Sequence, residues 1–218
     1  MAVVMTYTSL ITDLQDYLER GTPDDTTVFE KIPTLITLAE RAIARRLKIL
    51  GFINTVMTTL TLDTPTFAKP DRWRATVSMR FGAVAPDGSL NQGTPIYTRS
   101  LEYCRRYWPD QRQTGVPKFY ADYDYQHWLI VPTPLQSYPW EVVYYQQPPY
   151  LGEDNVSNWL SEYAPNALLY RALIEAEPFL KNDERIATWR QLYEEEMNGL
   201  DVESLRRAAD RAAVRKED

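Results

Sequence analysis

The spacing of apolar residues changes twice along the 218-residue chain, and this change most constrains the fold. From Thr6 to Leu50 apolar residues recur at helical spacing, residues 55–150 contain runs with the two-residue period of a β-strand, and helical spacing returns after Val156. Helical segments that are apolar on one face bury it most simply against each other. The pattern predicts an α+β fold, in which a bundle of long helices from both chain ends carries an inserted antiparallel β-rich domain.

Four segments follow from this pattern. Residues 1–54 are predicted to supply the N-terminal helices of the bundle, residues 55–150 the inserted β-rich domain, and residues 151–198 the C-terminal helices. Residues 199–218 are predicted to form a protruding C-terminal helix or tail, because Leu205 and several alanines make only a thin apolar stripe there. Gly199 lowers helix stability by about 1 kcal/mol relative to alanine, so we expect the segment beyond it to swing before it docks.

Local signals place the individual elements. Thr8 or Ser9 is expected to cap a first helix that ends at Gly21. A second helix is expected within residues 25–50, where Pro33 marks either its first turn or a break between a short helix and the main one. Near the C-terminus, apolar residues at steps of three and four predict an amphipathic helix with a buried face of Ile186, Trp189, Tyr193 and Met197.

The central region contains the clearest strand of the chain. In "RWRATVSMRF" the apolar residues Trp73, Ala75, Val77, Met79 and Phe81 alternate with polar ones, as a strand buried on one face requires. Residues 117–134 predict a hairpin that turns near Asp124 to Gln126, and a short helix is expected from Ser100 to Pro109. The stretch "GAVAPDGSLNQGTP", residues 82–95, is interpreted as an exposed loop because of its Gly, Pro, Asn and Asp content.

Composition excludes several classes of protein. The net charge of −6 argues against a broad phosphate-binding surface, and Cys104, as the single cysteine, cannot form an intramolecular disulfide or a cysteine-based zinc cluster. No export signal is recognisable at the N-terminus, and no run of 18 apolar residues predicts a membrane span. We therefore expect synthesis in a reducing cytoplasm and no membrane partner.

Candidate chemistry is sparse. One candidate metal or acid–base group consists of Asp122, Asp124 and His127. Acidic residues beside a turn, however, more often only keep the turn in solvent. Cys104 has no second histidine to activate it, and no nucleotide-binding or nucleophile-elbow motif occurs. The prediction is a protein that is not an enzyme, with no catalytic, metal or cofactor site and no bound cofactor.

Aromatic and basic residues suggest binding surfaces instead. Six aromatic residues crowd the third quarter of the chain, where they serve as strand core, as a protein interface or as a sugar-stacking platform: Tyr138, Trp140, Tyr144, Tyr145, Tyr150 and Trp159. Arg72, Arg74 and Arg80 share one predicted strand face and are a candidate charge-pairing or DNA-facing strip, although a solvated strand face is the simpler explanation.

The order of these elements resembles a known family. Residues 115–151, "GVPKFYADYDYQHWLIVPTPLQSYPWEVVYYQQPPYL", and residues 158–197, "NWLSEYAPNALLYRALIEAEPFLKNDERIATWRQLYEEEM", look like the head-to-tail adaptor (connector) proteins of tailed bacteriophages. The helical start at residues 10–47 fits the same pattern. The likeness covers roughly residues 6–200. It rests on the order of the elements and on the type of residue in each, because the pattern contains no catalytic motif that could test it.

The resemblance implies a structural virion protein of the neck, synthesised in the host cytoplasm. Such adaptors form a ring, commonly of twelve copies, below the portal protein, and the tail or nozzle protein attaches beneath while DNA passes through without sequence-specific binding. Their C-terminal segment often docks on the portal. The corresponding portal-binding residues expected here are Leu205, Arg206, Arg207, Ala208, Arg211, Ala212 and Arg215.

Two alternatives remain open at this point. A β-rich tail module that reads glycans on a helical stalk would use Tyr138, Trp140, Tyr144, Tyr145 and Trp159 as an exposed, coplanar row. A hydrolase would be centred on Asp122, Asp124 and His127. Burial of the aromatic rings favours the adaptor, whereas an exposed row favours the glycan reader.

Overall fold

The protein divides into two compact units, which are described here separately. The computed structural model describes residues 4–47, 50–86, 88–179 and 184–212, with the side chains of Thr26, Ala208, Asp210, Arg211 and Ala212 left out. Residues Met1–Phe52 and Gln147–Asp218 form a helical unit, and residues Ile53–Gln146 form a β unit. Within the described ranges, no helix combines the length and the apolar character that crossing a membrane requires.

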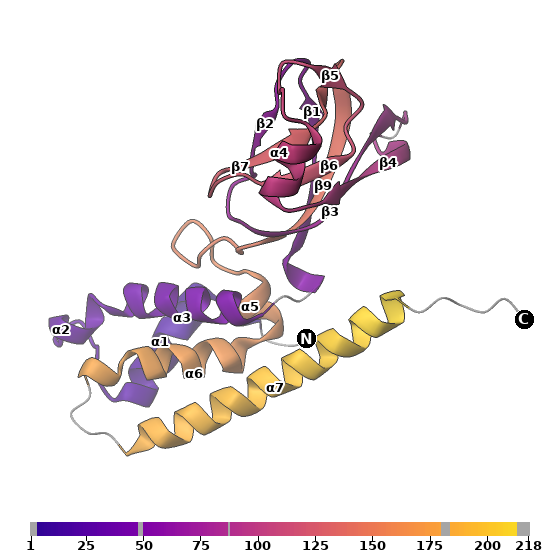
Figure 1. Ribbon diagram of the computed structural model, residues 1–218. Helices are drawn as coiled ribbons and strands as arrows, with labels where there is room; N and C mark the ends of the chain where they lie inside the picture. Colours follow the sequence, from indigo (N-terminus) through magenta and orange to yellow (C-terminus); the bar gives the residue numbers. More distant parts are fainter. Residues whose placement is uncertain (1–3, 48–49, 87, 180–183, 213–218) are drawn as a thin grey trace, which may run out of the picture. The chain divides into compact units, whose positions relative to one another are not determined.

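The helical unit contains helices from both ends of the chain (Figure 1). They are α1 (Tyr7–Leu18), α2 (Thr26–Phe29), α3 (Ile32–Arg46), η1 (Leu50–Phe52), α5 (Trp159–Tyr163), α6 (Pro165–Glu175), η2 (Glu177–Phe179) and α7 (Arg185–Ala212). Helix α6 packs against α1, α3 and α7, so segments far apart in the sequence share one core. A bundle of long helices is not confirmed: among the described helices only α7, with 28 residues, exceeds the 15 residues of α3.

The start of α1 corrects one sequence expectation. The hydroxyl of Thr6, not of Thr8 or Ser9, accepts the N–H of Ser9 at 3.2 Å, and the Ser9 hydroxyl accepts the N–H of Thr6 at 2.8 Å. This reciprocal pair is a capping box. The helix ends at Leu18, where Glu19 adopts a left-handed conformation with φ 53°, two residues before Gly21. At Pro33 both expected features occur, because α2 is a separate short helix and Pro33 lies in the first turn of α3.

A buried carboxylate holds the chain where it re-enters the helical unit. Glu40 of α3 is only 1% exposed. Its Oε1 accepts the Nδ2–H of Asn158 at 2.6 Å and the N–H of Leu151 at 3.2 Å. Asn158 in turn caps α5 by accepting the N–H groups of Leu160 and Ser161. The carboxylate therefore fixes residues 147–158 on α3 and positions the start of α5.

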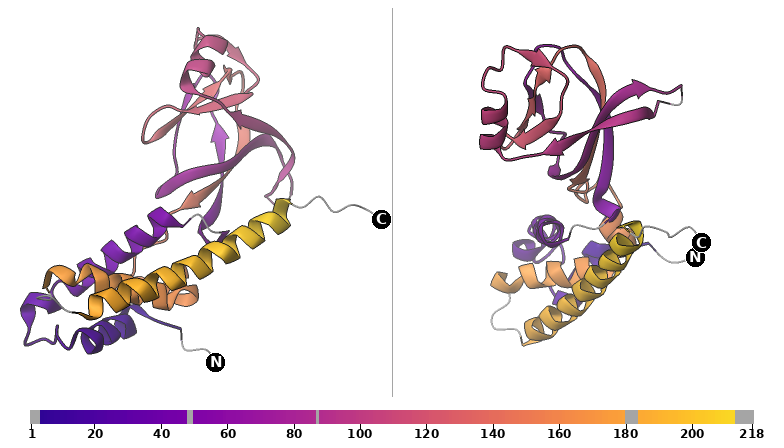
Figure 2. Two further views of the ribbon diagram at one scale, coloured as in Figure 1. Left: turned by 60° about the horizontal axis from the view of Figure 1, so that its bottom comes forward. Right: turned by 45° about the vertical axis from the view of Figure 1, so that its right-hand side comes forward.

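The β unit is built on one curved sheet that nearly closes on itself (Figure 2). Its seven strands follow the order β1-β9-β3-β4-β6-β7-β2. They are β1 (Ile53–Leu60), β2 (Thr66–Ala68), β3 (Trp73–Val84), β4 (Leu90–Thr98), β6 (Phe119–Asp122), β7 (His127–Val131) and β9 (Tyr138–Gln146). A small second pair joins β5 (Thr114–Gly115) to β8 (Thr133–Pro134). The expected purely antiparallel arrangement is wrong, because β4 pairs with β6 and β5 with β8 in parallel.

Two cores stabilise this unit. The larger one contains Met79 and Phe81 of β3, Trp128 of β7, and Trp140 and Val142 of β9. The smaller one lies beneath α4 (Leu101–Tyr107), which packs on β6 and β7 through Cys104 against Ala121, Leu129 and Val131. Helix α4 begins at Ser100, whose hydroxyl accepts the N–H of Tyr103, and it ends just before Trp108 and Pro109, as expected from the sequence.

Two sequence expectations for this unit are wrong. The stretch 82–95 is a hairpin rather than a loop: β3 continues to Val84, the N–H of Ala85 bonds to the carbonyl of Ser89, and β4 starts at Leu90. The alternation in β3 also fails at Val77, which is 38% exposed. The pairing of β3 with β9 shifts register between Thr76 and Ser78, and such an irregularity turns a side chain to the other face of the sheet.

Glu40 generates a prediction about the pH dependence of stability. Burial raises the pKa of Glu40 from 4.5 to about 7, although the hydrogen bonds from Asn158 and Leu151 act in the opposite direction. Because the folded-state pKa is the higher one, this group favours folding below pH 4.5, and the contribution is lost as the pH rises through 7. The difference corresponds to roughly 3 kcal/mol.

We expect the free energy of unfolding, measured by urea titration, to fall between pH 5 and pH 8. Glu40→Gln should flatten this slope, since the amide does not titrate. Glu30→Gln, a change at an exposed glutamate, serves as the control and should retain the wild-type slope. An unchanged slope in Glu40→Gln would show that another group causes the pH dependence.

Candidate docking surface

Helix α7 buries one face along its first half. Ile186, Trp189, Tyr193 and Met197 are all 8% exposed or less, as their spacing predicts. Figure 1 shows that α7 extends past the end of α6, so its C-terminal half has no α6 beside it. Whatever the second half of α7 contacts must therefore come from other segments or from another protein.

The outer face of the second half is apolar. Val202 is 48% exposed and Leu205 is 70% exposed. On a helix these positions point away from the side that carries Leu200 and Arg207, because each residue advances the helix by about 100°. Gly199 lies one turn before Val202, and no atom lies within 4 Å of a Cβ built on it. Large apolar side chains at this degree of exposure, on a helix packed on its other side, are typical of a docking face.

The inner face of the same segment lies near an aromatic cluster. Leu200, Glu203 and Arg207 line a small cavity together with Leu50, Gly51 and Trp159. Trp159 stacks on Tyr163, with ring centroids 5.4 Å apart, and Tyr163 is 66% exposed. Gly51 is required beneath this cluster, since a Cβ there would lie 2.1 Å from Nε1 of Trp159.

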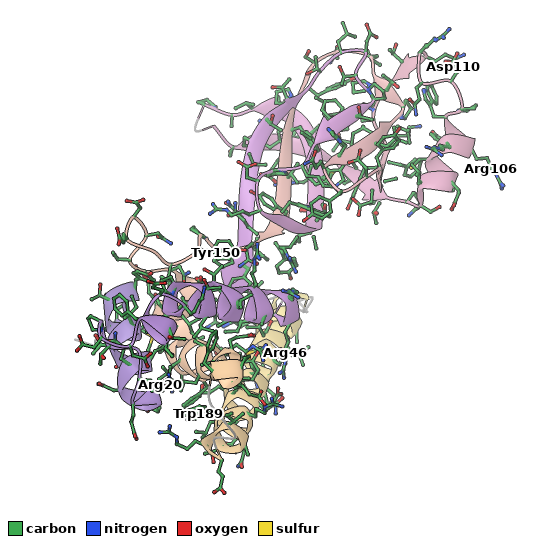
Figure 3. The ribbon with its side chains drawn as sticks, turned by 90° about the vertical axis from the view of Figure 1, so that its left-hand side faces the viewer. Arg20, Arg46, Arg106, Asp110, Tyr150 and Trp189 are labelled. Carbon is green, nitrogen blue, oxygen red and sulfur yellow. The ribbon has the colours of Figure 1, made fainter. Side chains whose placement is uncertain are left out.

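Ion pairs hold α7 to the end of α3. Arg46 donates to Glu194 at 2.7 Å, lies 3.7 Å from Asp201, and its guanidinium sits over the Tyr193 ring at 6.0 Å. Figure 3 places Arg46 beside α7 within the helical unit. Asp201 lies beyond Gly199, so the segment after the glycine is tied to its own unit on one side. The expectation of a hinge at Gly199 is not supported, because α7 runs from Arg185 to Ala212 without a break.

The expected portal-binding residues all belong to this second half or to the tail that follows it. Leu205 and Arg206 are exposed. Arg207 forms an ion pair with Glu203 one turn earlier. Ala208, Arg211 and Ala212 lie in α7 but their side chains are outside the described part, and Arg215 lies outside the described residues altogether. Sequence reasoning named Trp159 as a candidate interface residue but did not place it near this surface, and it did not single out Val202 or Tyr163. For Val202, three residues before Leu205, the spacing was the available signal.

A larger cleft nearby is lined mainly by paired charges. It has a volume of about 600 Å³ and lies between α6, η2 and α7. Arg171 pairs with Glu175, Arg190 pairs with Glu177, and Arg46 pairs with Glu194. These pairs link α6, η2 and α7 across the cleft, although the buried Nε of Arg171 has no hydrogen-bond partner among the described residues, and we do not assign a ligand to the cleft.

Only Asp124 and His127 of the candidate acid–base group are brought together, and Asp122 has a different partner. Asp122 pairs with Lys69 at 2.5 Å. Asp124 accepts the backbone N–H groups of Gln126 and His127 at 2.7 Å and lies 3.0 Å from Nδ1 of His127. These contacts build the turn of the β6–β7 hairpin. Among the described residues, no group of three His, Cys, Asp or Glu side chains is arranged to hold a metal ion. Cys104 is fully buried, and burial raises the pKa of its thiol, which disfavours the reactive thiolate.

The aromatic row required by a glycan reader is absent from its expected place. Trp140 and Tyr144 are 1% and 3% exposed and belong to the core of the β unit. Tyr145 occupies the opposite face of β9, and Tyr150 and Trp159 belong to the helical unit. The arginines do not form one strand-face strip, because Arg72 precedes β3 and has φ 58°, and Arg80 bonds to Glu141 on β9.

The comparison with known families decides between these readings. The model of the family described as SU10 adaptor protein matches residues 5–216, nearly the whole chain. The chain belongs to this family. It is therefore a bacteriophage head-to-tail adaptor, as the order of its sequence elements indicated. No curated protein matches the chain. For a structural adaptor, an exposed apolar helix face is expected to contact protein rather than a small molecule.

The unbroken path of α7 through Gly199 generates a prediction. Gly199→Ala should raise the free energy of unfolding by about 0.5–1 kcal/mol, because alanine has the higher helix propensity and its methyl group meets open space. Chemical denaturation measures this change. Gly88→Ala is the contrasting control, since Gly88 has φ 82° and alanine is strained there. A loss of stability in Gly199→Ala would indicate that α7 bends at this residue.

Proposed function

We propose that the adaptor forms a ring, with twelve copies as the expected number, below the portal protein in the virion neck. The ring joins the capsid to the tail or nozzle protein and lets DNA pass through its centre. Membership in a family of structural adaptors supports this role and favours a protein that is not an enzyme. The net charge of −6 is compatible with DNA sliding past without being gripped.

The observation that carries the proposal is the outer face of the second half of α7. Val202 and Leu205 present apolar surface there, next to the exposed Arg206. We assign this face, with Arg207, Ala208, Arg211, Ala212 and Arg215, to the contact with the portal. The short alanine side chains allow close approach, and the arginines form charge-assisted hydrogen bonds with acidic groups of the portal.

Portal attachment should depend on these apolar side chains. The double variant Val202→Glu/Leu205→Glu places two charges in the contact, so we expect it to lose stable attachment in a co-sedimentation assay with portal rings. Its melting temperature should stay close to wild type, because both positions are exposed. Ala187→Glu/Thr188→Glu, which adds the same charge to exposed positions at the other end of α7, is the control and should attach normally. Attachment of equal strength in both variants would disprove this role for the helix end.

Shortening the chain after Asn198 tests the same contact more severely. This truncation removes Asp201, which lies 3.7 Å from Arg46, and the residues that line the cavity beside Trp159. We therefore expect the truncated chain to fold with a modest loss of stability and to lose portal attachment. If it fails to fold, the double variant still decides the question.

Ring formation leads to a separate prediction. Native mass spectrometry of the wild-type adaptor with an excess over portal should give many copies per complex, with twelve expected. A monomer in the absence of portal is consistent with the proposal, because a ring can close only on its template. One or two copies per portal at saturation would contradict it.

A further inference from the structure

A cluster of tyrosines and arginines on the β unit has no role in the functions described above. Tyr103 and Tyr107 of α4 stack with ring centroids 6.1 Å apart, and both meet the Phe119 ring edge to face, at 5.5 and 5.1 Å. Tyr97 is 58% exposed, Tyr103 43% and Tyr107 37%. Large rings of this kind, packed on one side and open to solvent on the other, form a flat surface that is partly apolar.

The local fold keeps these rings in place. Tyr103 and Tyr107 are four residues apart, so they share one face of α4, while Cys104 points inward to the core. Parallel pairing of β4 with β6 sets Tyr97 directly opposite Phe119. The rings are therefore mounted on a helix and two paired strands, which makes the surface ready to bind without prior ordering.

Unpaired positive charge surrounds the rings. Arg99 lies over the Phe119 ring at 5.3 Å and over the Tyr103 ring at 5.8 Å. Arg105 and Arg106 are exposed, and within the described part of the chain neither forms an ion pair. Figure 3 shows Arg106 and Asp110 on the outer side of the β unit. Residues 97–118 contain five Lys or Arg against two Asp or Glu. We call the set Tyr97, Arg99, Tyr103, Arg105, Arg106 and Tyr107 the arginine–tyrosine surface.

Acidic residues predominate at the start of the same chain. Residues 1–30 contain six Asp or Glu and a single arginine. Asp16 and Asp24 are exposed and, among the described residues, have no ion-pair partner. Tyr17 is 44% exposed and Phe29 39% exposed. We call the set Asp16, Tyr17, Asp24, Phe29 and Glu30 the acidic helical surface; the basic groups beside it are Arg20, which pairs with Asp25, the exposed Lys31, and Arg185, which donates to the carbonyl of Tyr17.

We propose that the arginine–tyrosine surface of one copy binds the acidic helical surface of the next copy. The inference rests on the proposed ring, for which it names the contact between neighbours. Tyrosine and arginine are the residues most enriched at the centres of protein interfaces, and the two surfaces are complementary in charge. Because the contact uses two different surfaces, a bound pair keeps one surface of each kind free, one on each copy. Such a head-to-tail contact adds further copies and closes into a ring when the rotation between neighbours allows it.

DNA is the competing partner for a basic aromatic surface. The observations favour a second copy, because the chain as a whole has a net charge of −6 and the β unit has only nine Lys or Arg against eight Asp or Glu. Phosphate contacts along a duplex need several basic residues in a row, whereas here half of the surface is tyrosine.

Charge reversal on each surface tests the contact. Arg105→Glu/Arg106→Glu and Asp16→Lys/Asp24→Lys each place like charges opposite one another. Each variant alone should self-associate at least tenfold more weakly than wild type in sedimentation velocity at low salt, without portal. A 1:1 mixture should regain association, because the reversed surface of one variant then meets the reversed surface of the other. The chain that carries all four changes should also associate.

The same variants are then counted on the portal by native mass spectrometry. Each alone should load far fewer copies than wild type, and the mixture should restore the count. If each variant alone associates and loads as wild type does, the proposed contact is wrong and the ring stands. If wild type neither self-associates nor loads many copies, the ring and the contact both fail.

Controls separate the remaining outcomes. Arg45→Glu/Arg74→Glu makes the same charge change at exposed arginines outside both surfaces, and it should behave as wild type. Melting temperatures confirm that each variant is folded. Binding to labelled double-stranded DNA provides the last comparison: DNA affinity lost in Arg105→Glu/Arg106→Glu alone, with no rescue in the mixture, would identify a DNA surface and overturn the proposal.

Discussion

The helical unit depends on one buried carboxylate, that of Glu40. A charged group that is 1% exposed is costly unless it is well hydrogen-bonded, and here Asn158 and the Leu151 amide supply the bonds. The same Asn158 side chain caps α5, and α5 carries Trp159 to its place beside Gly51. The hydrogen bonds of Glu40 in α3 therefore help to position Trp159 and the aromatic cluster near the second half of α7. A hydrophobic residue at position 40 would leave both donors unpaired.

Much of the fold could be predicted from the sequence, because the apolar residues of most elements follow either the helical or the strand period. Ile186, Trp189, Tyr193 and Met197 are buried as their spacing requires, and the β6–β7 hairpin turns where Asp124 was expected to turn it. The hairpin at Val84 and Leu90 was missed because its turn residues outweigh the short runs beside them. Val77 shows the other limit: a strand pattern says nothing about a register shift, which depends on the partner strand.

Contacts between distant residues could not be predicted. Glu40 looks like an ordinary solvated residue of an amphipathic helix, and only the folded chain brings Leu151 and Asn158 to it. The thin stripe beyond Gly199 indicated a helix in need of a partner, and the exposure of Val202 and Leu205 agrees with that indication. The residues assigned to the portal contact remain a prediction. Tyr103 and Tyr107 were visible at a helical spacing of four, but their exposure depends on which face of α4 covers the sheet.

Charge has two different uses in this chain. In the helical unit several arginines lie against acids of the same unit: Arg46 with Glu194, Arg171 with Glu175 and Arg207 with Glu203. Such exposed pairs add little stability individually, although Arg46 also covers the Tyr193 ring. On α4 of the β unit, Arg105 and Arg106 form no ion pair among the described residues, although Glu102 lies one turn before them on the same helix. An arginine that is already paired within its unit must give up that pair before it can bind elsewhere, whereas an unpaired arginine beside exposed tyrosines is free to take an acidic partner from another molecule. The distribution of ion pairs, more than the net charge, therefore separates the surfaces that hold the protein together from those that bind.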